Sequence, residues 1–398
     1  MASACLVLKP GREKSLLRRH PWIFSGAVAS IKGSPAAGET VDVLNSDGRF
    51  LARASYSPLS QIRARVWTWD EEQQVDEAFF LSRLQQAIQA RQNLADFPPN
   101  DALRLVHGES DRLPGLILDR YGGTLVAQFS SAGAERWREL IAEQALLITQ
   151  AEGLYERSEV EARRLEGLPE RAGSVWGAPP PEQLLIHENG LRFWVDVYRG
   201  HKTGYYLDQR DNRLRVRALA KDREVLDCFC YSGGFSTNAL VGGAAKILAM
   251  DSSDVALAQL QKNLALNDLP VERVELLEGD VFQSLRAFRD RGRAFDMIIL
   301  DPPKFAHTAA QAQRAARGYK DINLLAFKLL RPGGLLVTYS CSGGISEDLF
   351  QKIVAGAALD AGVHAQISER LSQAPDHPVA LSFPEGAYLK GLVLRVTG

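Results

Sequence analysis

An acidic residue and a cysteine each follow an apolar segment in the C-terminal part of the sequence. Asp301 opens the stretch Asp-Pro-Pro-Lys-Phe directly after the apolar residues 297–300, and Cys341 lies between two serines directly after residues 335–339. If both segments are neighbouring parallel strands, the carboxylate and the thiol share one edge of a sheet. Open α/β sheets bind their ligands at that edge, so this pair is the first candidate for catalysis.

A thiol and an acid suit chemistry on a pyrimidine base. C5 of cytosine is a poor nucleophile, and it becomes reactive only after a thiolate has added to C6. Cys341 fits the nucleophile, and Asp301 fits the acid that protonates or hydrogen-bonds N3 and the exocyclic amine. The structural alternatives are an inert core thiol and a turn residue before two prolines. The position of each residue directly after a strand favours catalysis.

Nitrogen methylation is the rival chemistry, and it needs no thiol. Enzymes that methylate amino groups usually have an aromatic residue directly after the two prolines, whereas here Lys304 takes that place and Phe305 follows. This difference favours carbon methylation. A non-catalytic RNA-binding assembly factor is a third alternative, against which the thiol and the acids at successive strand ends argue.

A glycine turn and further acids suggest a cofactor pocket in the same region. Residues 227–235 place glycines after the first expected strand, where a tight turn admits close approach of a ligand, but they lack the dinucleotide pattern GxGxxG. Asp251 follows the second strand and suits ribose hydroxyls, and Asp280 follows the third and suits an adenine amino group. Turn or N-cap roles are the alternative for each acid. Together they resemble class I methyltransferases that use S-adenosylmethionine, over roughly residues 215–398.

Arg210, just before the sheet, is a candidate partner for the carboxylate of this cofactor, with a structural salt bridge as the alternative. The candidate cofactor-binding residues are thus Asp227, Ser232, Gly233, Gly234, Phe235, Asp251, Asp280, Asp301 and Arg210. Cys228 and Cys230 alternate along a strand end without partner ligands, so they are expected to be core or loop residues, and no metal is expected.

The elements that must position these residues alternate between strands and helices. Apolar segments predict strands at 224–229, 246–250, 273–277, 295–300 and 334–339, with an antiparallel one at 392–396. Helical spacing predicts helices at about 234–242, 253–267, 281–291, 310–330 and 346–361. This alternation predicts an α/β fold with a doubly wound sheet.

The sequence before residue 190 has a different pattern. Short β-like segments with turn residues between them predict a small β domain over residues 1–72, and residues 1–70 hold ten Lys and Arg against five acids. Its candidate RNA-binding residues are Arg12, Lys14, Arg18, Arg19 and Trp22, with a solvated basic face as the alternative. A helix near 76–94 and strands around a second helix predict a central α+β domain over 73–190, in which we find no catalytic constellation.

Composition and cysteine spacing limit the classes of protein to which this sequence can belong. The 398 residues are 45% hydrophobic with a net charge of −1, so there is no overall basic field. The four cysteines lack the spacing of a disulfide framework or a zinc site, and no apolar segment reaches the length of a signal peptide or membrane span. A cytoplasmic protein without a membrane partner is the expectation.

Longer motifs make the resemblance specific. Residues 11–22, 200–210, 301–305 and 318–323 are similar to bacterial 23S ribosomal RNA cytosine-5 methyltransferases with an N-terminal PUA domain. The resemblance implies a Rossmann-like methyltransferase domain over 191–398, S-adenosylmethionine as cofactor and Cys341 as a single catalytic cysteine. The second cysteine that other RNA cytosine-5 methyltransferases keep after the Asp-Pro-Pro-like motif is absent here.

The resemblance also implies a partner. The target base must be extruded from folded RNA, so naked 23S rRNA or an early assembly intermediate is the expected substrate. Lys304 and Lys320 are candidates for holding the phosphates that flank the extruded base, with an ordinary helix surface as the alternative. A homodimer is a further expectation.

Overall fold

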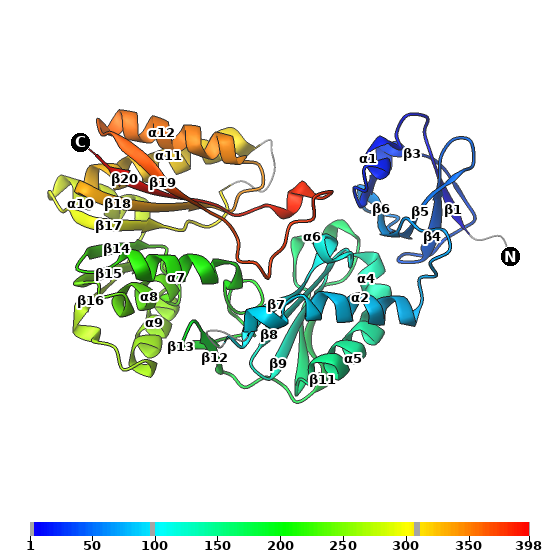
Figure 1. The fold of residues 1–398 in the computed structure, drawn as a ribbon, viewed down its shortest axis with the longest axis horizontal. Coiled ribbons are helices and arrows are strands. Elements are labelled where there is room, and N and C mark those ends of the chain that lie inside the picture. The colour runs from blue at the N-terminus through cyan, green and yellow to red at the C-terminus, as the bar shows by residue number, and fades with distance from the viewer. Residues whose placement is uncertain (1–3, 96–99, 306–310, 398) are drawn as a thin grey trace. The chain divides into compact units, whose positions relative to one another are not determined.

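The computed structural model describes residues 4–95, 100–305 and 311–397 (Figure 1). Its residues form two compact units. Unit 1 comprises Met1–Gly190, Val195–Leu207 and Pro375–Gly386, and unit 2 comprises Leu191–Trp194, Asp208–Ala374 and Ala387–Gly398. Both units are therefore built from segments that are discontinuous in the sequence.

The first sheet of unit 1 has six strands in the order β2-β6-β5-β4-β1-β3. Their bounds are β1 (Cys5–Leu8), β2 (Trp22–Phe24), β3 (Val28–Lys32), β4 (Thr40–Leu44), β5 (Phe50–Tyr56) and β6 (Ile62–Thr68), with the one-turn helix α1 (Lys14–Leu17) and the 3-10 turn η1 (Ser25–Ala27) between strands. Alternate residues such as Val41 and Val43 point into the core, because side chains of a strand alternate between its two faces. The small β domain expected from the sequence is present.

The second sheet of unit 1 has the order β11-β10-β9-β8-β7. Its strands are β7 (Ala102–His107), β8 (Leu116–Tyr121), β9 (Thr124–Phe129), β10 (Gly153–Arg157) and β11 (Ala172–Gly177). The helices are α2 (Glu77–Gln89), α3 (Gln92–Ala95), α4 (Ala132–Arg136), α5 (Arg138–Thr149) and α6 (Glu161–Leu165), with the 3-10 turn η2 (Gly108–Asp111). Asp76 caps α2 by accepting a 2.9 Å hydrogen bond from the backbone N–H of Phe79. A hairpin of β12 (Leu184–Glu188) and β13 (Leu191–Val195) follows.

Unit 2 contains a seven-stranded sheet in the order β16-β15-β14-β17-β18-β20-β19. Its strands are β14 (Glu224–Cys228), β15 (Lys246–Asp251), β16 (Val274–Glu278), β17 (Phe295–Leu300), β18 (Leu330–Ser340), β19 (Ala365–Leu371) and β20 (Lys390–Val396). The first five are parallel, and β20 pairs antiparallel with β18, as the sequence predicted. Strand order reverses between β14 and β17, which is where sheets of this kind bind ligands.

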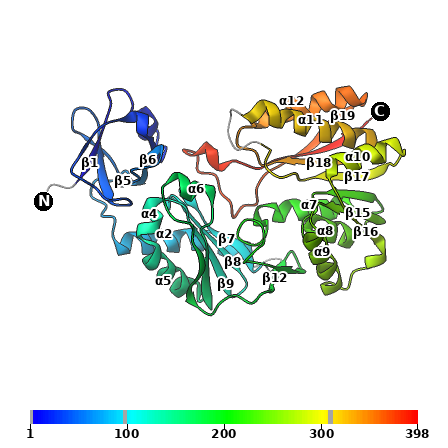
Figure 2. The same cartoon turned by 180° about the vertical axis from the view of Figure 1, so that it is seen from behind.

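Helices cover both faces of this sheet (Figures 1 and 2). They are α7 (Arg210–Leu219), α8 (Gly234–Val241), α9 (Asp254–Leu266), α10 (Val281–Asp290), α11 (Ala312–Leu329) and α12 (Glu347–Ala361). One core cluster joins the sheet to α10, α11 and α12, and a second joins it to α7, α8 and α9. The doubly wound α/β fold predicted from the sequence is confirmed.

Two elements of unit 2 were not predicted. Strand β19 has alternate half-buried and exposed residues at the edge of the sheet, so its sequence has no apolar run. Helix α7 has four arginines among its ten residues and buries Val216 as its one aliphatic side chain, so helical apolar spacing is missing. Both elements depend on contacts with residues distant in sequence.

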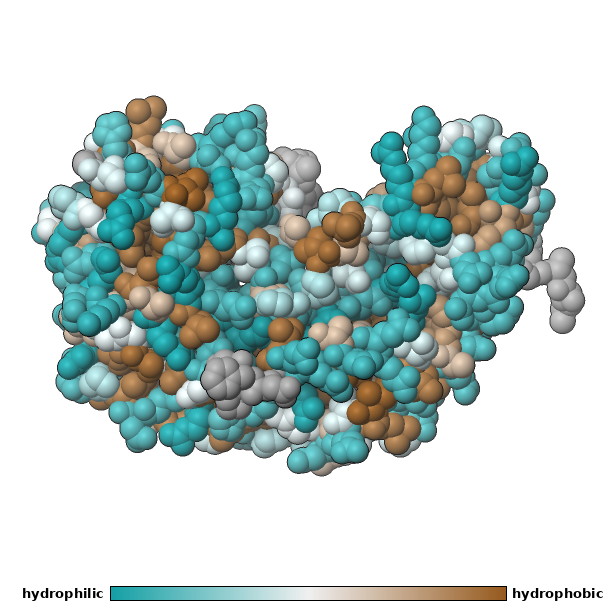
Figure 3. Space-filling model, in the orientation of Figure 1, coloured by the Kyte–Doolittle hydropathy of each residue, from teal (hydrophilic) through white to brown (hydrophobic). Residues whose placement is uncertain are grey.

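Hydrophilic residues cover most of the face shown in Figure 3, with brown hydrophobic residues in small separate groups among them. Isolated exposed apolar side chains, such as Leu381 and Leu359, are normal on protein surfaces. Within the described residues, no helix combines the length and the hydropathy that crossing a membrane requires.

Candidate active site

Asp227, near the end of β14, is a buried acid with an open hydrogen-bonding position. Its Oδ2 accepts a 2.6 Å hydrogen bond from the hydroxyl of Ser236, while its fully buried Oδ1 has no partner among the described residues. The pKa of Asp227 is raised to about 7, mainly by burial; the Ser236 hydrogen bond opposes this shift, and the charges of Asp301 and Asp251 contribute to it. The site therefore holds an acceptor that a ligand with a donor group would satisfy.

The loop after β14 holds three residues in left-handed backbone conformations. Phe229 has φ of 63°, Tyr231 of 48° and Gly233 of 80°. Such conformations cost energy for residues other than glycine and often occur in ligand-binding loops. At Gly233 a Cβ would lie 2.2 Å from the Cγ of Leu260, so the turn also needs glycine for space. Gly233 was a candidate from the sequence, whereas nothing in the sequence indicated the left-handed conformations of Phe229 and Tyr231.

Ser232 and Phe235 anchor this loop to the core of unit 2. Ser232 is buried, and its carbonyl accepts a 3.0 Å hydrogen bond from the side chain of Asn263. The Phe235 ring stacks on the buried ring of Tyr339, with centroids 5.6 Å apart, while Gly234 begins α8. Phe235 therefore positions the loop as a core residue.

Asp251 and Asp280 lie at the ends of the next two strands. Asp251 accepts hydrogen bonds from the backbone N–H groups of Tyr231 at 2.8 Å and Ser253 at 3.0 Å, one on each oxygen. Each carboxylate oxygen has a second lone pair, so both remain able to accept from ribose hydroxyls. Asp280 is exposed and caps α10 through a 2.9 Å bond from Gln283, which is the N-cap role considered from sequence.

Arg210 begins α7 and is only 3% exposed. Its Nε donates a 3.0 Å hydrogen bond to the side chain of the adjacent Asp211. The structural salt bridge considered as the alternative is therefore present.

Asp301 and Cys341 follow paired strands. Leu300 of β17 and Thr338 of β18 are partners in the parallel register, which places the residues beyond both strands at the same edge. The Sγ atom of half-buried Cys341 lies 3.9 Å from the carbonyl oxygen of Pro302. The charge of Asp301 also raises the pKa of Asp227, so the two acids are close enough to interact electrostatically.

Lys390 is a site residue that the sequence did not reveal. Strand β20 pairs antiparallel with β18 so that Lys390 is the register partner of Ser340, and its Nζ donates a 2.8 Å hydrogen bond to the carbonyl oxygen of Ser342. The pKa of Lys390 is lowered to about 8, mainly by burial; the thiol of Cys341 opposes this shift, and the charge of Lys304 contributes to it. Lys390 is therefore a cation near the candidate nucleophile.

Helix α11 supports the cysteine loop. The buried Tyr319 shares a 3.0 Å hydrogen bond with the hydroxyl of Ser342 and packs its ring 4.7 Å from that of Phe305. The next residue, Lys320, forms a 2.7 Å ion pair with Asp360 of α12. Lys304, the other lysine expected to bind RNA, is exposed and has no ion pair among the described residues. Of the two lysines, only Lys320 is therefore already paired with an acid.

The N-terminal cations are exposed, whereas the neighbouring Trp22 makes contacts with other side chains of unit 1. Arg12, Lys14 and Arg18 have no ion pairs in the described part of the chain. The half-buried Trp22 donates a 2.8 Å hydrogen bond from Nε1 to Glu109 and packs edge-on against Phe383 at 4.9 Å. These contacts fix the orientation of the ring within unit 1, and the role of Trp22 in RNA binding stays a prediction.

These residues fit S-adenosylmethionine. The unpaired buried oxygen of Asp227 suits a donor group of the cofactor, and Asp251 suits its ribose hydroxyls. The glycine turn at 233 permits close backbone approach. No group of three or more His, Cys, Asp or Glu side chains that could hold a metal ion occurs within residues 4–95, 100–305 and 311–397.

Comparisons with known proteins agree with this geometry. Residues 146–395 match the model of the S-adenosylmethionine-dependent methyltransferases, and residues 6–69 match that of the PUA-like domain. The ribosomal RNA large subunit methyltransferase I of Tolumonas auensis is 53% identical over 394 residues, covering 99% of both chains. The Escherichia coli K12 protein of that name is 50% identical, covering 99% of this chain and 100% of its own.

Solved structures share the fold. A candidate S-adenosylmethionine-dependent methyltransferase from Streptococcus mutans has a TM-score of 0.84 at 22% identity, over 98% of this chain and 100% of its own. A candidate methyltransferase solved with S-adenosylhomocysteine has a TM-score of 0.87 at 22% identity, with the same coverage. The expected methyltransferase fold, the PUA-like N-terminal domain and the cofactor S-adenosylmethionine are confirmed.

Proposed function

Because the chain belongs to the family of S-adenosylmethionine-dependent methyltransferases, we propose that it methylates C5 of a cytosine in 23S ribosomal RNA through a covalent bond between Cys341 and C6. The observation that carries the proposal is the placement of Cys341 and Asp301 after paired parallel strands. Lys390 beside the thiol adds support, because positive charge favours the reactive thiolate.

Each protein group has a defined task in the reaction. The thiolate of Cys341 adds to C6, and the carboxyl group of Asp301 delivers a proton to N3 as the C4–C5 enamine forms. When bound, S-adenosylmethionine supplies a sulfonium methyl group that the enamine carbon C5 takes. Asp301 or an ordered water then removes the C5 proton, and the C6–S bond breaks to release the thiolate of Cys341. The N3 proton passes to whichever of the two did not take the C5 proton.

The substrate follows from the relatives and from the chemistry. The relatives at 50–53% identity are named as methyltransferases of large-subunit ribosomal RNA. A cytosine inside folded RNA must leave its stack before a thiol reaches C6, which favours naked 23S rRNA or an early assembly intermediate. The exposed side chain of Lys304 is proposed to contact a phosphate next to the extruded base. Homodimerisation and the domain boundaries 1–72, 73–190 and 191–398 stay predictions.

The first test measures the product. Protein-free, unmodified 23S rRNA is incubated with labelled S-adenosylmethionine, and the nucleosides are analysed for the wild type, Cys341→Ala and Cys5→Ala. We expect 5-methylcytidine from the wild type and from Cys5→Ala, whose altered residue is buried in unit 1, and none from Cys341→Ala. A methylated nitrogen, or full activity without the thiol, would move the assignment to the amino-methylating class. RNA binding without any methyl transfer would favour the assembly factor.

A second test traps the covalent bond. RNA that carries 5-fluorocytidine has no C5 proton to remove, so the final elimination is blocked after methyl transfer. We expect a stable protein–RNA adduct, with the modified peptide containing Cys341, and no adduct with Cys341→Ala. An adduct on another cysteine would contradict the assignment of the nucleophile.

A further inference from the structure

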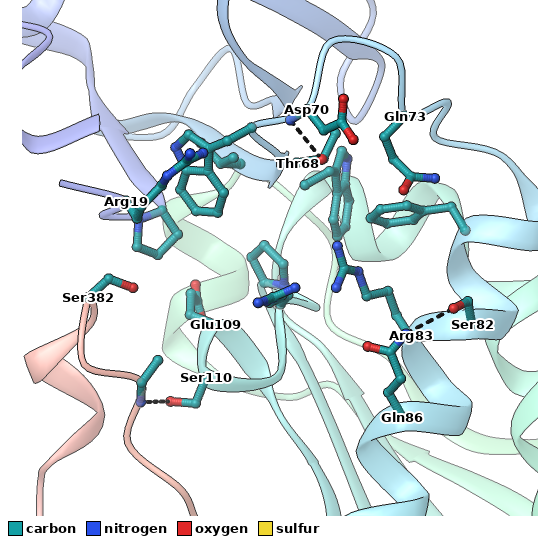
Figure 4. Close-up of a pocket in the computed structure, with 18 of the residues that line it drawn as sticks. Arg19, Thr68, Asp70, Gln73, Ser82, Arg83, Gln86, Glu109, Ser110 and Ser382 are labelled. Atoms are coloured by element: carbon teal, nitrogen blue, oxygen red, sulfur yellow. Dashed lines mark hydrogen bonds between the residues drawn. The ribbon is translucent and has the colours of Figure 1, made fainter. Parts of the chain in front are cut away.

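Unit 1 contains a cavity of about 1190 Å³, which we call the arginine cavity (Figure 4). It is bounded by the end of β6, by helix α2, by the turn η2 and by residues 380–382. Four arginines line it: Arg18, Arg19, Arg83 and Arg112. In Figure 4 Arg83 extends from α2 toward the middle of the cavity, and Arg19 lies on the opposite side.

The four arginines have no acidic partners within the described residues. Arg19 lies over the ring of Trp69 at 5.5 Å, and Arg83 lies over the ring of Phe79 at 5.1 Å. These contacts orient the guanidinium groups without neutralising them. Their five N–H donors each are thus available for an anion.

The acids of the cavity are engaged elsewhere. Asp70 accepts a 3.0 Å hydrogen bond from the backbone of Glu72, and Asp76 caps α2. Glu109 accepts the 2.8 Å bond from Trp22 and lies 3.7 Å from the Nε of Arg65, outside the arginine cavity. None of them forms an ion pair with one of the four arginines among the described residues, although their charges offset part of the positive charge of the cavity.

Two of the arginines repel one another. Arg83 is half-buried, and its burial together with the charge of Arg112 lowers its pKa. Holding two guanidinium groups together in a partly desolvated space is unfavourable unless an anion lies between them. Arginine forks match the oxygen atoms of phosphate, so phosphate is the anion that this arrangement suits.

We propose that the arginine cavity binds a backbone phosphate of the RNA substrate, at a site separate from the methyl-transfer site. The inference rests on the proposed function for the identity of the RNA. Arg18 belongs both to the cavity and to the exposed cations that include Arg12 and Lys14, so basic side chains continue from the surface into the cavity. Its 1190 Å³ exceeds the roughly 300–1,000 Å³ of small-molecule sites, which favours a segment of a polymer over a free ion.

The test measures RNA binding without methyl transfer. Binding of protein-free 23S rRNA is measured over a series of salt concentrations for the wild type, Arg83→Gln/Arg112→Gln and Arg49→Gln. Arg49 is an exposed arginine outside the cavity with no ion pair in the described chain. For the double variant we expect about tenfold weaker binding and a log–log salt slope smaller by about one, as the loss of one phosphate contact predicts.

Two further measurements separate this result from misfolding. Affinity for S-adenosylmethionine is expected to be unchanged, because the cofactor residues belong to unit 2. Arg83→Lys is expected to keep the salt slope while weakening binding, because lysine keeps the charge and loses the fork.

Two outcomes would overturn the proposal: RNA binding by the double variant equal to the wild type, or the same loss with Arg49→Gln. Stabilisation by inorganic phosphate alone, with RNA binding unaffected in the double variant, would show a small-anion site instead. None of these measurements depends on the methylated product. Their result can therefore be distinguished from the result of the Cys341→Ala test of the proposed function.

Discussion

The Nζ atom of Lys390 donates a 2.8 Å hydrogen bond to the carbonyl oxygen of Ser342, the residue that follows Cys341. This bond fixes an ammonium group beside the candidate nucleophile, because β20 runs antiparallel to β18 and brings Lys390 opposite Ser340. A half-buried cation at this place stabilises a thiolate more strongly than one in bulk water.

Lys390→Met is therefore expected to reduce the reactivity of Cys341. Removing the charge would cost the thiolate about 1.4 kcal/mol, which slows alkylation by iodoacetamide about tenfold. The rate is followed at pH 7.5 by mass spectrometry of the peptide that contains Cys341. Lys352→Met is the control, because Lys352 is exposed and paired with Asp348 on α12. Equal alkylation rates in Lys390→Met and the wild type would show that Lys390 does not activate the thiol.

The stability of unit 2 is expected to fall as pH rises toward 7. The folded Asp227 keeps its proton up to a pKa of about 7, whereas the unfolded carboxyl loses it near 3.8. The folded state thus binds more protons between these values, so this contribution is complete below pH 3.8 and is lost by about pH 7. It amounts to on the order of 4 kcal/mol.

Asp227→Asn removes this titration. Its urea midpoint for unit 2 should vary less between pH 5 and 8 than that of the wild type, whereas Asp254→Asn, which alters an exposed acid, should follow the wild type. A pH profile of Asp227→Asn that matched the wild type would show that Asp227 is already ionised in the folded state.

Affinity for S-adenosylmethionine is expected to rise with pH across the same range. The cofactor carries a positive sulfonium and an ammonium group, which favour the ionised form of Asp227. Binding at pH 6 should therefore release a proton and be weaker than at pH 8. Calorimetry in two buffers of different ionisation enthalpy measures the proton release. Its absence, or its persistence in Asp227→Asn, would contradict the role of this acid.

Gly233→Ala is expected to destabilise unit 2 and weaken cofactor binding. The new Cβ would lie 2.2 Å from the Cγ of Leu260 in a backbone with φ of 80°. Strain and overpacking together suggest about 3 kcal/mol. Gly292→Ala is the matched control, with φ of 67° and no atom within 4 Å of its Cβ, and should cost only about 1 kcal/mol. Urea midpoints give both values, and equal midpoints would show that Leu260 moves aside.

Local patterns in the sequence were sufficient for the framework of unit 2. The apolar runs that became β14, β15, β17 and β18 lie within one or a few residues of the expected ranges, because buried parallel strands are continuous hydrophobic segments. The residues after those strands, Asp251, Asp301 and Cys341 among them, could therefore be assigned to one edge of the sheet. The residue types at that edge then indicated the chemistry.

Only the tertiary structure decided which side chains meet across the chain. Lys390 reaches the cysteine loop through an antiparallel pairing, and Trp22 is held by Glu109 and Phe383, so neither contact has a local pattern. The arginine cavity likewise combines arginines that are distant in sequence: two follow α1, one lies in α2 and one follows η2. Periodicity reports the environment of a residue along its own element, whereas register and packing between distant elements set its partners. The sequence thus determined the fold and indicated the candidate reacting groups, and the tertiary structure determined the charged surroundings of those groups.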